Sequence, residues 1–334
     1  KTLTDVTQEI APEISKIGRV TAAIWTDYNT DGQLELAVVG EWMPLTLFVQ
    51  QSGTFKAQKV PNSEGWWNSI TGADIDNDGD VDYIAGNHGL NSPFKASKSE
   101  PVTLICGDFD KNGQQDPLVF KYTDGMNAPF VNRDIFTSHM PAYNNAFYSF
   151  SQYADATFNT LFDEQALSNA SINEVYELQS CVFVNKGDGS FELRPLPVQA
   201  QSAPMYGLLT IDINEDGIVD LLSTGGSYSN HYEYGSIDAL GGLLMLGNGD
   251  GSFKAIPTSK SGFQISKAGR ALSLIYQDKS AHPLILAANN DGPLQVFEWA
   301  TTSKIVKAPE NAAYAILRLK NGKQQRQEFY TGGG

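Results

Sequence analysis

A nine-residue acidic loop occurs four times and constrains this sequence more than any other feature. Every copy has the form D-x-[DN]-x-[DN]-G-x-x-[DE], which puts side-chain oxygens at positions 1, 3, 5 and 9 and a glycine at position 6. Carboxylates this close repel one another, so the pattern predicts a cation inside each loop. The copies are loop 1, DYNTDGQLE (27–35), loop 2, DIDNDGDVD (74–82), loop 3, DFDKNGQQD (108–116), and loop 4, DINEDGIVD (212–220).

The donor atoms predict calcium as that cation. Ca²⁺ takes about six to eight oxygen ligands in flexible geometry, whereas Mg²⁺ prefers rigid octahedral sites that retain water. Position 7 is expected to give its backbone carbonyl, because Ile218 has no side-chain oxygen. We expect about four structural ions, one per loop. The predicted ligands are Asp27, Asn29, Asp31, Gln33 and Glu35 in loop 1, Asp74, Asp76, Asp78, Asp80 and Asp82 in loop 2, Asp108, Asp110, Asn112, Gln114 and Asp116 in loop 3, and Asp212, Asn214, Asp216, Ile218 and Asp220 in loop 4.

The stretches beside the loops predict strands and exclude an EF-hand. An EF-hand loop ends in Glu at position 12 and lies between two helices. Here the last acid is at position 9, and the flanking stretches are short and apolar, such as VTAAIWT before loop 1 and LELAVVG after it. A single copy could be an ordinary Asp/Asn/Gly turn without metal. Four copies with one spacing favour the metal site.

The loops also mark a repeat of four strands, which is typical of a β-propeller blade. Past the loop, a third strand leads into a hairpin turn, QQSGTF at 50, NKGDGSF at 185 or GNGDGSF at 247, and then into a fourth strand. We therefore predict an all-β fold, a β-propeller of four-stranded blades over residues 1–306. The five predicted units lie near 19–60, 66–105, 102–197, 204–258 and 268–299, and the last has lost the calcium pattern.

Residues 125–180 interrupt the third unit and are predicted to be a helical insertion. Tyr143, Phe147, Phe150, Ala154 and Phe158 recur at helical spacing, and DEQALSNA predicts another short helix. We expect the aromatic stripe to pack the helix onto the propeller. The alternative is a lid or a platform for a partner.

The loops resemble the FG-GAP or VCBS repeats of integrin-alpha-type propellers. EGWWNSITGADIDNDGDVDYIAGNHGLNSPFK, YADATFNTLF and YGSIDALGGLLMLGNGDGSF resemble a bacterial branch of that family found in surface proteins. AYAILRLKNGKQQRQEFYTGGG, from 313, resembles the start of the ASPIC/UnbV segment, which we place at 307–334. The resemblance implies calcium binding, about seven blades and a cell-surface or outer-membrane location. It also implies that the chain is the C-terminal part of a larger protein, with LTDVTQEI, from Leu3, as the outer strand of an earlier blade.

Composition narrows the function classes. With 38 acids against 23 bases the formal net charge is −15, which disfavours nucleic acid and anionic membranes as partners. The sequence contains no apolar run of about 18 residues, so we predict no membrane span. Cys106 and Cys181 lie in apolar strand-like runs and are expected to be buried free thiols.

No catalytic motif is recognisable. The sequence lacks GxSxG, HExxH, CxxC and Walker patterns, and its four histidines are scattered. Most pairs of neighbouring acids lie in the acidic loops. A carboxylate that binds metal is ionised and is therefore a poor proton donor. We therefore expect a non-catalytic module for protein binding or assembly. The alternative is a carbohydrate-binding or polysaccharide-degrading, lyase-type propeller, for which the sequence shows no obvious base.

Strand parity predicts the binding face. If the acidic loops join strands one and two of each blade, the loops joining strands two and three emerge at the opposite end. The chain places extra residues there in three stretches, which we assign to three consecutive blades: from Gly86, in 125–180 and from Thr224. Trp66 and Trp67 could instead fill gaps between blades. The predicted residues for a protein partner or glycan are Trp66, Trp67, His88, Arg133, Tyr206, His231, Tyr232 and Arg270.

Overall fold

Antiparallel sheets dominate the described part of the chain, as the all-β prediction requires. The computed structural model describes residues 3–228, 235–276, 282–300, 308–309, 312–319, 322 and 324–329. The first sheet contains β1 (Arg19–Thr26), β2 (Glu35–Met43), β3 (Thr46–Gln51) and β4 (Thr54–Lys59), with β5 (Gly65–Trp66) paired to β2. The third contains β14 (Met205–Ile211), β15 (Asp220–Gly225), β16 (Leu243–Gly247) and β17 (Phe253–Ile256), and the fourth contains β18 (Ala268–Ile275), β19 (Leu284–Asn290) and β20 (Gln295–Glu298).

The second sheet is assembled from two distant parts of the chain. Its order is β6 (Ser69–Ala73), β7 (Asp82–Gly86), β12 (Cys181–Asn185) and β13 (Phe191–Pro195). β7 pairs directly with β12, with Ala85 opposite Cys181. The predicted units 66–105 and 102–197 are therefore wrong, because together they supply one four-stranded sheet. The inserted segment is 87–180 rather than 125–180, and we call it the insertion module.

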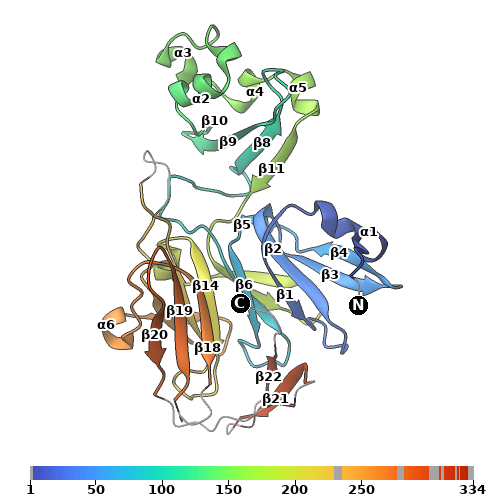
Figure 1. Ribbon diagram of the computed structural model, residues 1–334, viewed down its shortest axis with the longest axis vertical. Coiled ribbons are helices and arrows are strands. Elements are labelled where there is room, and N and C mark those ends of the chain that lie inside the picture. The colour runs from blue at the N-terminus through green and yellow to red at the C-terminus, as the bar shows by residue number, and fades with distance from the viewer. Residues whose placement is uncertain are drawn as a thin grey trace.

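The insertion module has a sheet of its own and lies at one end of the molecule (Figure 1). The sheet order is β10-β9-β8-β11. Loop 3 joins β8 to β9 inside this module. It has the same sequence pattern as the other loops, but it does not lie in the row of four adjacent sheets, which begin with β1, β6, β14 and β18. The elements are β8 (Val102–Gly107), β9 (Asp116–Thr123), β10 (Met126–Pro129), β11 (Ser171–Val175), α2 (Arg133–His139), η2 (Pro141–Tyr143), α3 (Phe150–Ala154), α4 (Phe158–Leu161) and α5 (Glu164–Ser168).

The predicted helix through 143–158 is broken into separate turns. Ser149 and Thr157 each form a capping box that starts a new short helix. The aromatic side chains pack onto the module's own sheet instead of the neighbouring sheets: Phe109 stacks on Phe162 at 3.9 Å between ring centroids. Phe150 is left largely exposed. The short helix predicted in DEQALSNA is confirmed as α5.

The N-terminal segment is helical, so its prediction as an outer strand is wrong. It forms α1 (Thr7–Ile10) and η1 (Pro12–Lys16), and both contact β4 at the outer edge of the first sheet. Ile14 and Ile17 pack against buried Val38 and Phe48 of that sheet. Glu13 accepts a hydrogen bond from the Ala57 amide at 2.9 Å and thereby holds the segment in place.

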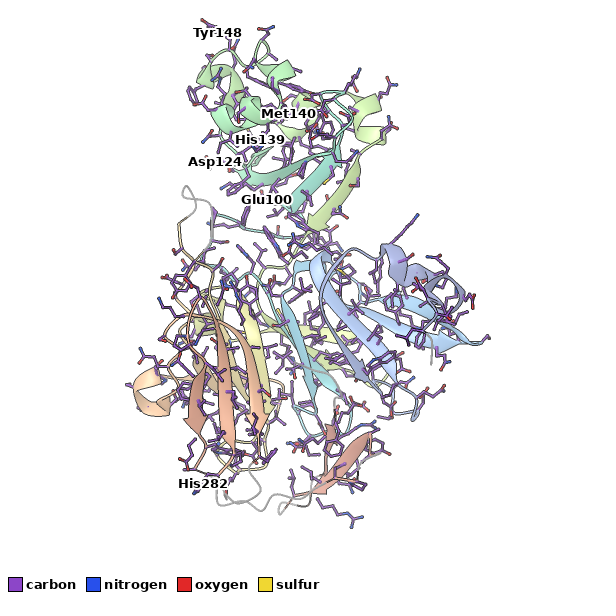
Figure 2. All side chains as sticks on the ribbon, viewed as in Figure 1. Glu100, Asp124, His139, Met140, Tyr148 and His282 are labelled. Carbon is purple, nitrogen blue, oxygen red and sulfur yellow. The ribbon has the colours of Figure 1, made fainter. Side chains whose placement is uncertain are left out.

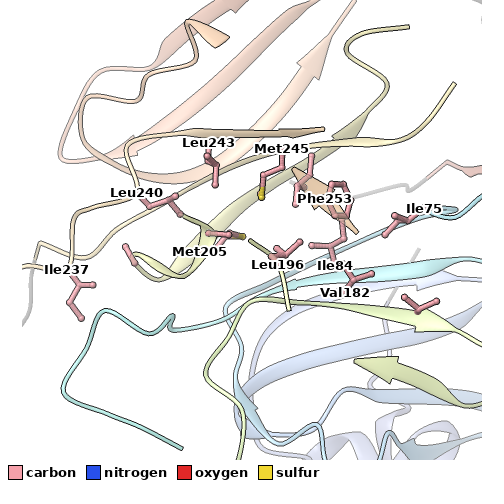
Figure 3. Packing of buried hydrophobic residues seen from close by; sticks show 14 residues of the cluster. Ile75, Ile84, Val182, Leu196, Met205, Ile237, Leu240, Leu243, Met245 and Phe253 are labelled. Carbon is pink, nitrogen blue, oxygen red and sulfur yellow. The ribbon is translucent and has the colours of Figure 1, made fainter. Parts of the chain in front are cut away.

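The first strands of the four sheets lie side by side in the order β1, β6, β14, β18. Close approach at this inner edge demands glycine: a Cβ on Gly86 would collide with the main-chain oxygen of Met205. Apolar side chains fill the space between adjacent sheets. Between the second and third sheets, Ile84 and Val182 face Met205 and Met245 (Figure 3).

A C-terminal hairpin lies at the other end of the sheets from the insertion module. It consists of β21 (Tyr314–Arg318) and β22 (Gln324–Glu328), and β22 contacts β6 (Figure 1). The hairpin falls in the predicted 307–334 segment. It reaches the turns that carry loops 1 and 2.

Both cysteines are free thiols, as expected from their strand-like context. Cys181 in β12 is buried, whereas Cys106 in β8 is only partly buried. Of the described helices, none combines the length and the apolar character needed to cross a membrane.

Trp67 is a core residue, which corrects its prediction as a partner-binding residue. It is 0% exposed between the first and second sheets. Its indole N–H donates to the Ser63 carbonyl at 2.8 Å, and its ring meets Phe183 edge to face at 5.3 Å between centroids. The parity argument placed Trp67 just before β6 but did not show which way the side chain points.

We predict that Trp67→Ala lowers the free energy of unfolding by about 3–5 kcal/mol, because it leaves a large cavity between two sheets. Urea unfolding measures this change. The matched control is Trp25→Ala, whose ring is 42% exposed and which should lose clearly less stability. Equal losses in the two variants would contradict the assignment of Trp67 to the core.

Candidate metal centres and the opposite face

All four acidic loops share one backbone conformation. Positions 4 and 6 are left-handed in every copy. The φ angles at position 4 lie in the narrow left-handed region that a side chain can still adopt, whereas those at position 6 lie beyond it and favour glycine. The φ angles are 58°, 60°, 59° and 61° at Thr30, Asn77, Lys111 and Glu215, and 84°, 100°, 85° and 84° at Gly32, Gly79, Gly113 and Gly217.

Side-chain oxygens accept hydrogen bonds from the loop's own amides and close each turn. In loop 1 the Gly32 amide donates to Asp27 Oδ2 at 3.1 Å, and the Gln33 amide donates to Asp31 Oδ1 at 2.8 Å. Loops 3 and 4 repeat both bonds, while in loop 2 Asp74 accepts from the Asp78 amide. The acids are therefore held close together in spite of their charge.

The acid at position 9 anchors the loop to the rest of its sheet. Asp82 accepts from the Ile75 amide at 2.9 Å with one oxygen and from the Asn185 amide, at the end of β12, at 2.8 Å with the other. Asp220 does the same with the amides of Ile213 and Gly247. Both carboxylates are fully buried. In loops 2 and 4, position 9 thus fixes the loop against the hairpin that joins strands three and four.

The buried acids carry more negative charge than nearby bases offset. Burial is the main cause that raises the pKa of Asp82 to about 7, of Asp74 to about 6 and of Asp220 to about 6. Burial, together with neighbouring Asp31, raises the pKa of Glu35 to about 7. Raised values mean that the ionised forms are poorly compensated, and a divalent cation would compensate them.

Two further observations fit a cation. Oxygens bound to one Ca²⁺ at about 2.3–2.6 Å lie no more than about 5 Å apart. Carboxylate oxygens of Asp74, Asp76 and Asp78 lie within 4.8 Å of one another, and so do those of the loop 3 acids at positions 1, 3 and 9. Asp27 Oδ1 and Asp76 Oδ1 are buried and have no hydrogen-bond partner among the described residues. The donors are all oxygens, as hard cations require.

Loops 1, 2 and 4 lie together, and loop 3 lies apart from them. The Asn77 side chain reaches the Gly217 carbonyl at 3.5 Å, which links loops 2 and 4, and Arg326 contacts both Asp27 and Asp74. Loop 3 packs among the helices of the insertion module through Phe109. The expectation that the loops share one face therefore holds for three of them.

The insertion module extends from the opposite end, as parity predicts, but it leaves from the second sheet alone. The stretches from Gly86 and in 125–180 therefore belong to one sheet, and the stretch from Thr224 belongs to the next, which corrects the assignment to three blades. Arg270 lies over the Tyr206 ring at 4.0 Å, and both residues are near the starts of inner strands. His231 and Tyr232 lie outside the described residues.

Aromatic residues cluster where the module joins the sheets. Trp66 stacks on His88 at 4.7 Å between centroids, and Trp42 and Phe94 pack around Trp66. The sequence analysis did not single out Trp42 and Phe94. Trp42 lies at a bulge in β2 and has φ 63°, which is unusual for a bulky side chain. Arg133 is elsewhere, on α2, where its guanidinium lies over Phe150 at 5.5 Å. The predicted partner residues therefore do not form one patch.

The histidines do not form a catalytic or metal cluster among the described residues. His139 lies in the insertion module and His282 at the opposite end of the molecule (Figure 2). His88 is in the aromatic cluster, and its Nε2 is buried without a hydrogen-bond partner among the described residues. Burial lowers the pKa of His88 to about 4.

We predict that removal of bound metal lowers the melting temperature, because the buried carboxylates of loops 1, 2 and 4 lose their counter-charge. Melting with and without a chelator, with metal removal checked by elemental analysis, measures the shift. Magnesium added back should restore less stability than calcium. An unchanged melting temperature after complete removal would count against structural ions.

We predict that His88 makes the protein less stable in acid. Its folded pKa is depressed from 6.5, so its contribution to stability is present above about pH 6.5 and is lost as the pH falls towards about 4. His88→Phe retains an aromatic ring on Trp66 and removes this titration. The difference in unfolding free energy between variant and wild type should therefore shift in favour of the variant across that range, as urea midpoints at several pH values would show. A difference that stays constant with pH would contradict this assignment.

The segment that carries loops 1 and 2 matches a known family of repeats. Residues 27–85 match the family model of the FG-GAP-like repeat. The match begins at the first acid of loop 1 and ends in β7, so it covers most of the first sheet, all of loop 2 and the start of the second sheet. No curated protein matches the chain. The chain therefore contains an FG-GAP-like repeat at the site where loops 1 and 2 lie.

Proposed function

We propose that this chain is a calcium-stabilised β-propeller module that binds or assembles with other molecules at the cell surface and is not catalytic. The observation that carries the proposal is the set of buried carboxylates at the turns between the first two strands of three sheets. Asp27, Asp74, Asp82 and Asp220 are each at most 3% exposed. The ligands of each ion come from one turn, so the ion stiffens a sheet and leaves little room for a substrate.

The four sheets are proposed to be propeller blades. Their inner strands are adjacent and each sheet packs face to face on the next, as blades do. The outer face of the fourth sheet leaves Ile275 and Val296 exposed, at 44% and 52%. A further blade packed on this face would cover them. The hairpin at 314–328 is proposed to begin the ASPIC/UnbV-like segment.

The proposed calcium binding and the proposed cell-surface location are consistent with each other. Calcium sites in extracellular modules have dissociation constants of about 10⁻⁴–10⁻³ M and are filled by the calcium outside cells. The acidic loops resemble those of surface proteins, and the net charge of −15 suits a protein that collects divalent cations. We therefore propose a cell-surface or outer-membrane system as its location.

The partner surface is proposed to be the far tip of the insertion module. Tyr148 is 83% exposed there (Figure 2), and Phe150, the first residue of α3, is 62% exposed. Exposed aromatic residues are typical anchors of protein interfaces. The Arg133 guanidinium lies against one face of the Phe150 ring, 5.5 Å from its centroid. The module is fixed to the first sheet, because the Tyr176 and Glu177 amides donate to the Glu64 carbonyl and the Trp66 amide donates to Asn87 Oδ1.

A polar pocket favours glycan binding as a second candidate function. It has a volume of about 440 Å³ and lies where β11 of the insertion module meets the first sheet. Trp42 and Tyr176 supply aromatic surface, Lys59 and Asn173 supply donors, and Glu64 and Glu174 supply acceptors. Glu64 Oε2 is buried and has no partner among the described residues. A sugar ring offers both an apolar face and hydroxyl groups to such a lining.

We predict that Tyr148→Ser combined with Phe150→Ser reduces partner capture at least about tenfold and leaves the melting temperature unchanged. The measurement is crosslinking on cells that make the chain, followed by quantitative mass spectrometry. The matched control is Trp25→Ser, an exposed aromatic residue at the loop 1 end, which should keep full capture. Equal capture by wild type and the double variant would reject the tip as the partner surface.

Glycan arrays distinguish the second candidate. Binding that is lost in Trp42→Ala and in Glu64→Gln but retained in the Tyr148/Phe150 double variant would support the pocket. Release of unsaturated products from acidic polysaccharides would instead indicate a lyase. The absence of any glycan binding would remove the second candidate and leave the protein partner.

A further inference from the structure

The C-terminal hairpin is bound to loop 1 by an ion pair with the first predicted ligand. Arg326 Nη2 donates to Asp27 Oδ2 at 2.7 Å, and both side chains are 5% exposed. Glu328 accepts from the Asp27 amide at 3.0 Å and from the Thr26 hydroxyl at 2.9 Å. Tyr314, on the other strand of the hairpin, lies against the guanidinium at 4.2 Å. The hairpin therefore contacts both the side chain and the main-chain amide of Asp27, at the start of loop 1.

The same hairpin also contacts loops 2 and 4. The Arg326 amide donates to Asp74 Oδ2 at 2.9 Å, and Gln325 Nε2 donates to Asn77 Oδ1 at 3.0 Å. The Leu319 side chain lies against Gly217 of loop 4. One hairpin therefore touches every acidic loop in the row of sheets, and its contacts include the position 1 acids of loops 1 and 2.

The contacts at Asp27 leave one oxygen for an ion. Oδ2 accepts from Arg326 and from Gly32, whereas Oδ1 is buried without a hydrogen-bond partner among the described residues. Outer-shell partners that hold a ligand in this way fix its orientation, and their loss commonly costs about 10–100-fold in metal affinity. Glu328 Oε1 lies 3.4 Å from Arg326 Nη2, so the hairpin brings a neutral pair and adds no net positive charge beside the ion.

We propose that the β21–β22 hairpin completes the metal centres of loops 1 and 2, with Arg326 as a positioning residue for Asp27, so that hairpin docking and calcium binding strengthen each other. The proposal rests on the calcium binding proposed above. Without an ion the clustered carboxylates repel one another. Asp27 and Asp74 are then no longer held where Arg326 contacts them. Linkage makes the effect reciprocal: calcium stabilises the docked hairpin by the same factor by which the hairpin raises calcium affinity.

Hydrogen exchange measured by mass spectrometry during a calcium titration tests both directions on the whole chain. Peptides that cover 314–328 report hairpin docking, and peptides that cover each acidic loop report the calcium midpoint of that loop. We expect the hairpin to be protected with calcium and to exchange faster after chelation. Hairpin exchange that is the same with and without calcium, in a protein whose loops respond to calcium, would overturn the proposal.

Variants separate the positioning role from general stability. Arg326→Gln should raise the calcium midpoint of loop 1 about tenfold and that of loop 2 less, because the variant keeps the main-chain amide that donates to Asp74. Loop 3 should be unchanged, because it lies in the insertion module. Arg326→Lys should recover part of the loss, since it restores the charge without the planar guanidinium that lies over the Tyr314 ring. The matched control is Arg318→Gln on the exposed side of β21, which should keep wild-type midpoints. Equal midpoints in Arg326→Gln and wild type would also overturn the proposal.

Loop variants test the reverse direction. Asp27→Asn should free the hairpin even at saturating calcium, whereas Asp108→Asn, at the same position in loop 3, should not. If no loop responds to calcium at all, the proposed function fails and the coupling fails with it. If the loops respond but the hairpin ignores them, only the coupling fails.

Discussion

The buried carboxylate at position 9 of the acidic loop is the interaction on which the row of sheets depends. In Asp82 one oxygen holds the turn between β6 and β7, and the other holds the Asn185 amide at the end of β12. A buried charge is stable only when hydrogen bonds or counter-charges satisfy it. In the second sheet this side chain therefore adds to the β7–β12 pairing that joins the two parts of the chain on either side of the insertion module. Asp220 does the same over a shorter distance in the third sheet.

Anchoring acids in this way accumulates negative charge at one end of the molecule. Loops 1, 2 and 4 bring their carboxylates together with a single arginine, Arg326, in direct contact with them among the described residues. Burial, with a smaller contribution from the neighbouring acids, raises the pKa values of Glu35, Asp74, Asp82 and Asp220, and these uncompensated charges are the reason why we propose divalent cations there. Loop 3 has the same sequence pattern in another setting: Asp108 is exposed and Asp116 only half-buried. An ion there would secure the insertion module rather than the row of sheets.

The two ends of the sheets suit different tasks. The acidic end is built from short turns that leave little variable surface. The opposite end carries the insertion module, with its exposed tip and the polar pocket at its base. Binding residues are usually found on loops held by a rigid scaffold. Ions that stiffen one end would thus hold the module at the other end in a fixed position.

The sequence alone determined the local structure of the acidic loops. The spacing of Asp, Asn and Gly predicted four turns between strands, and the described turns share one left-handed pattern because that spacing is a property of neighbouring residues. The sequence also placed the insertion at the end opposite loops 1, 2 and 4. Tertiary structure decided what depends on distant pairing: that β7 pairs with β12, that loop 3 belongs to a separate module, that Trp67 points into the core, and that Arg326 meets Asp27. These contacts join residues far apart in the chain, and local patterns carry no signal for which of several similar strands will pair or which surface a distant hairpin will cover.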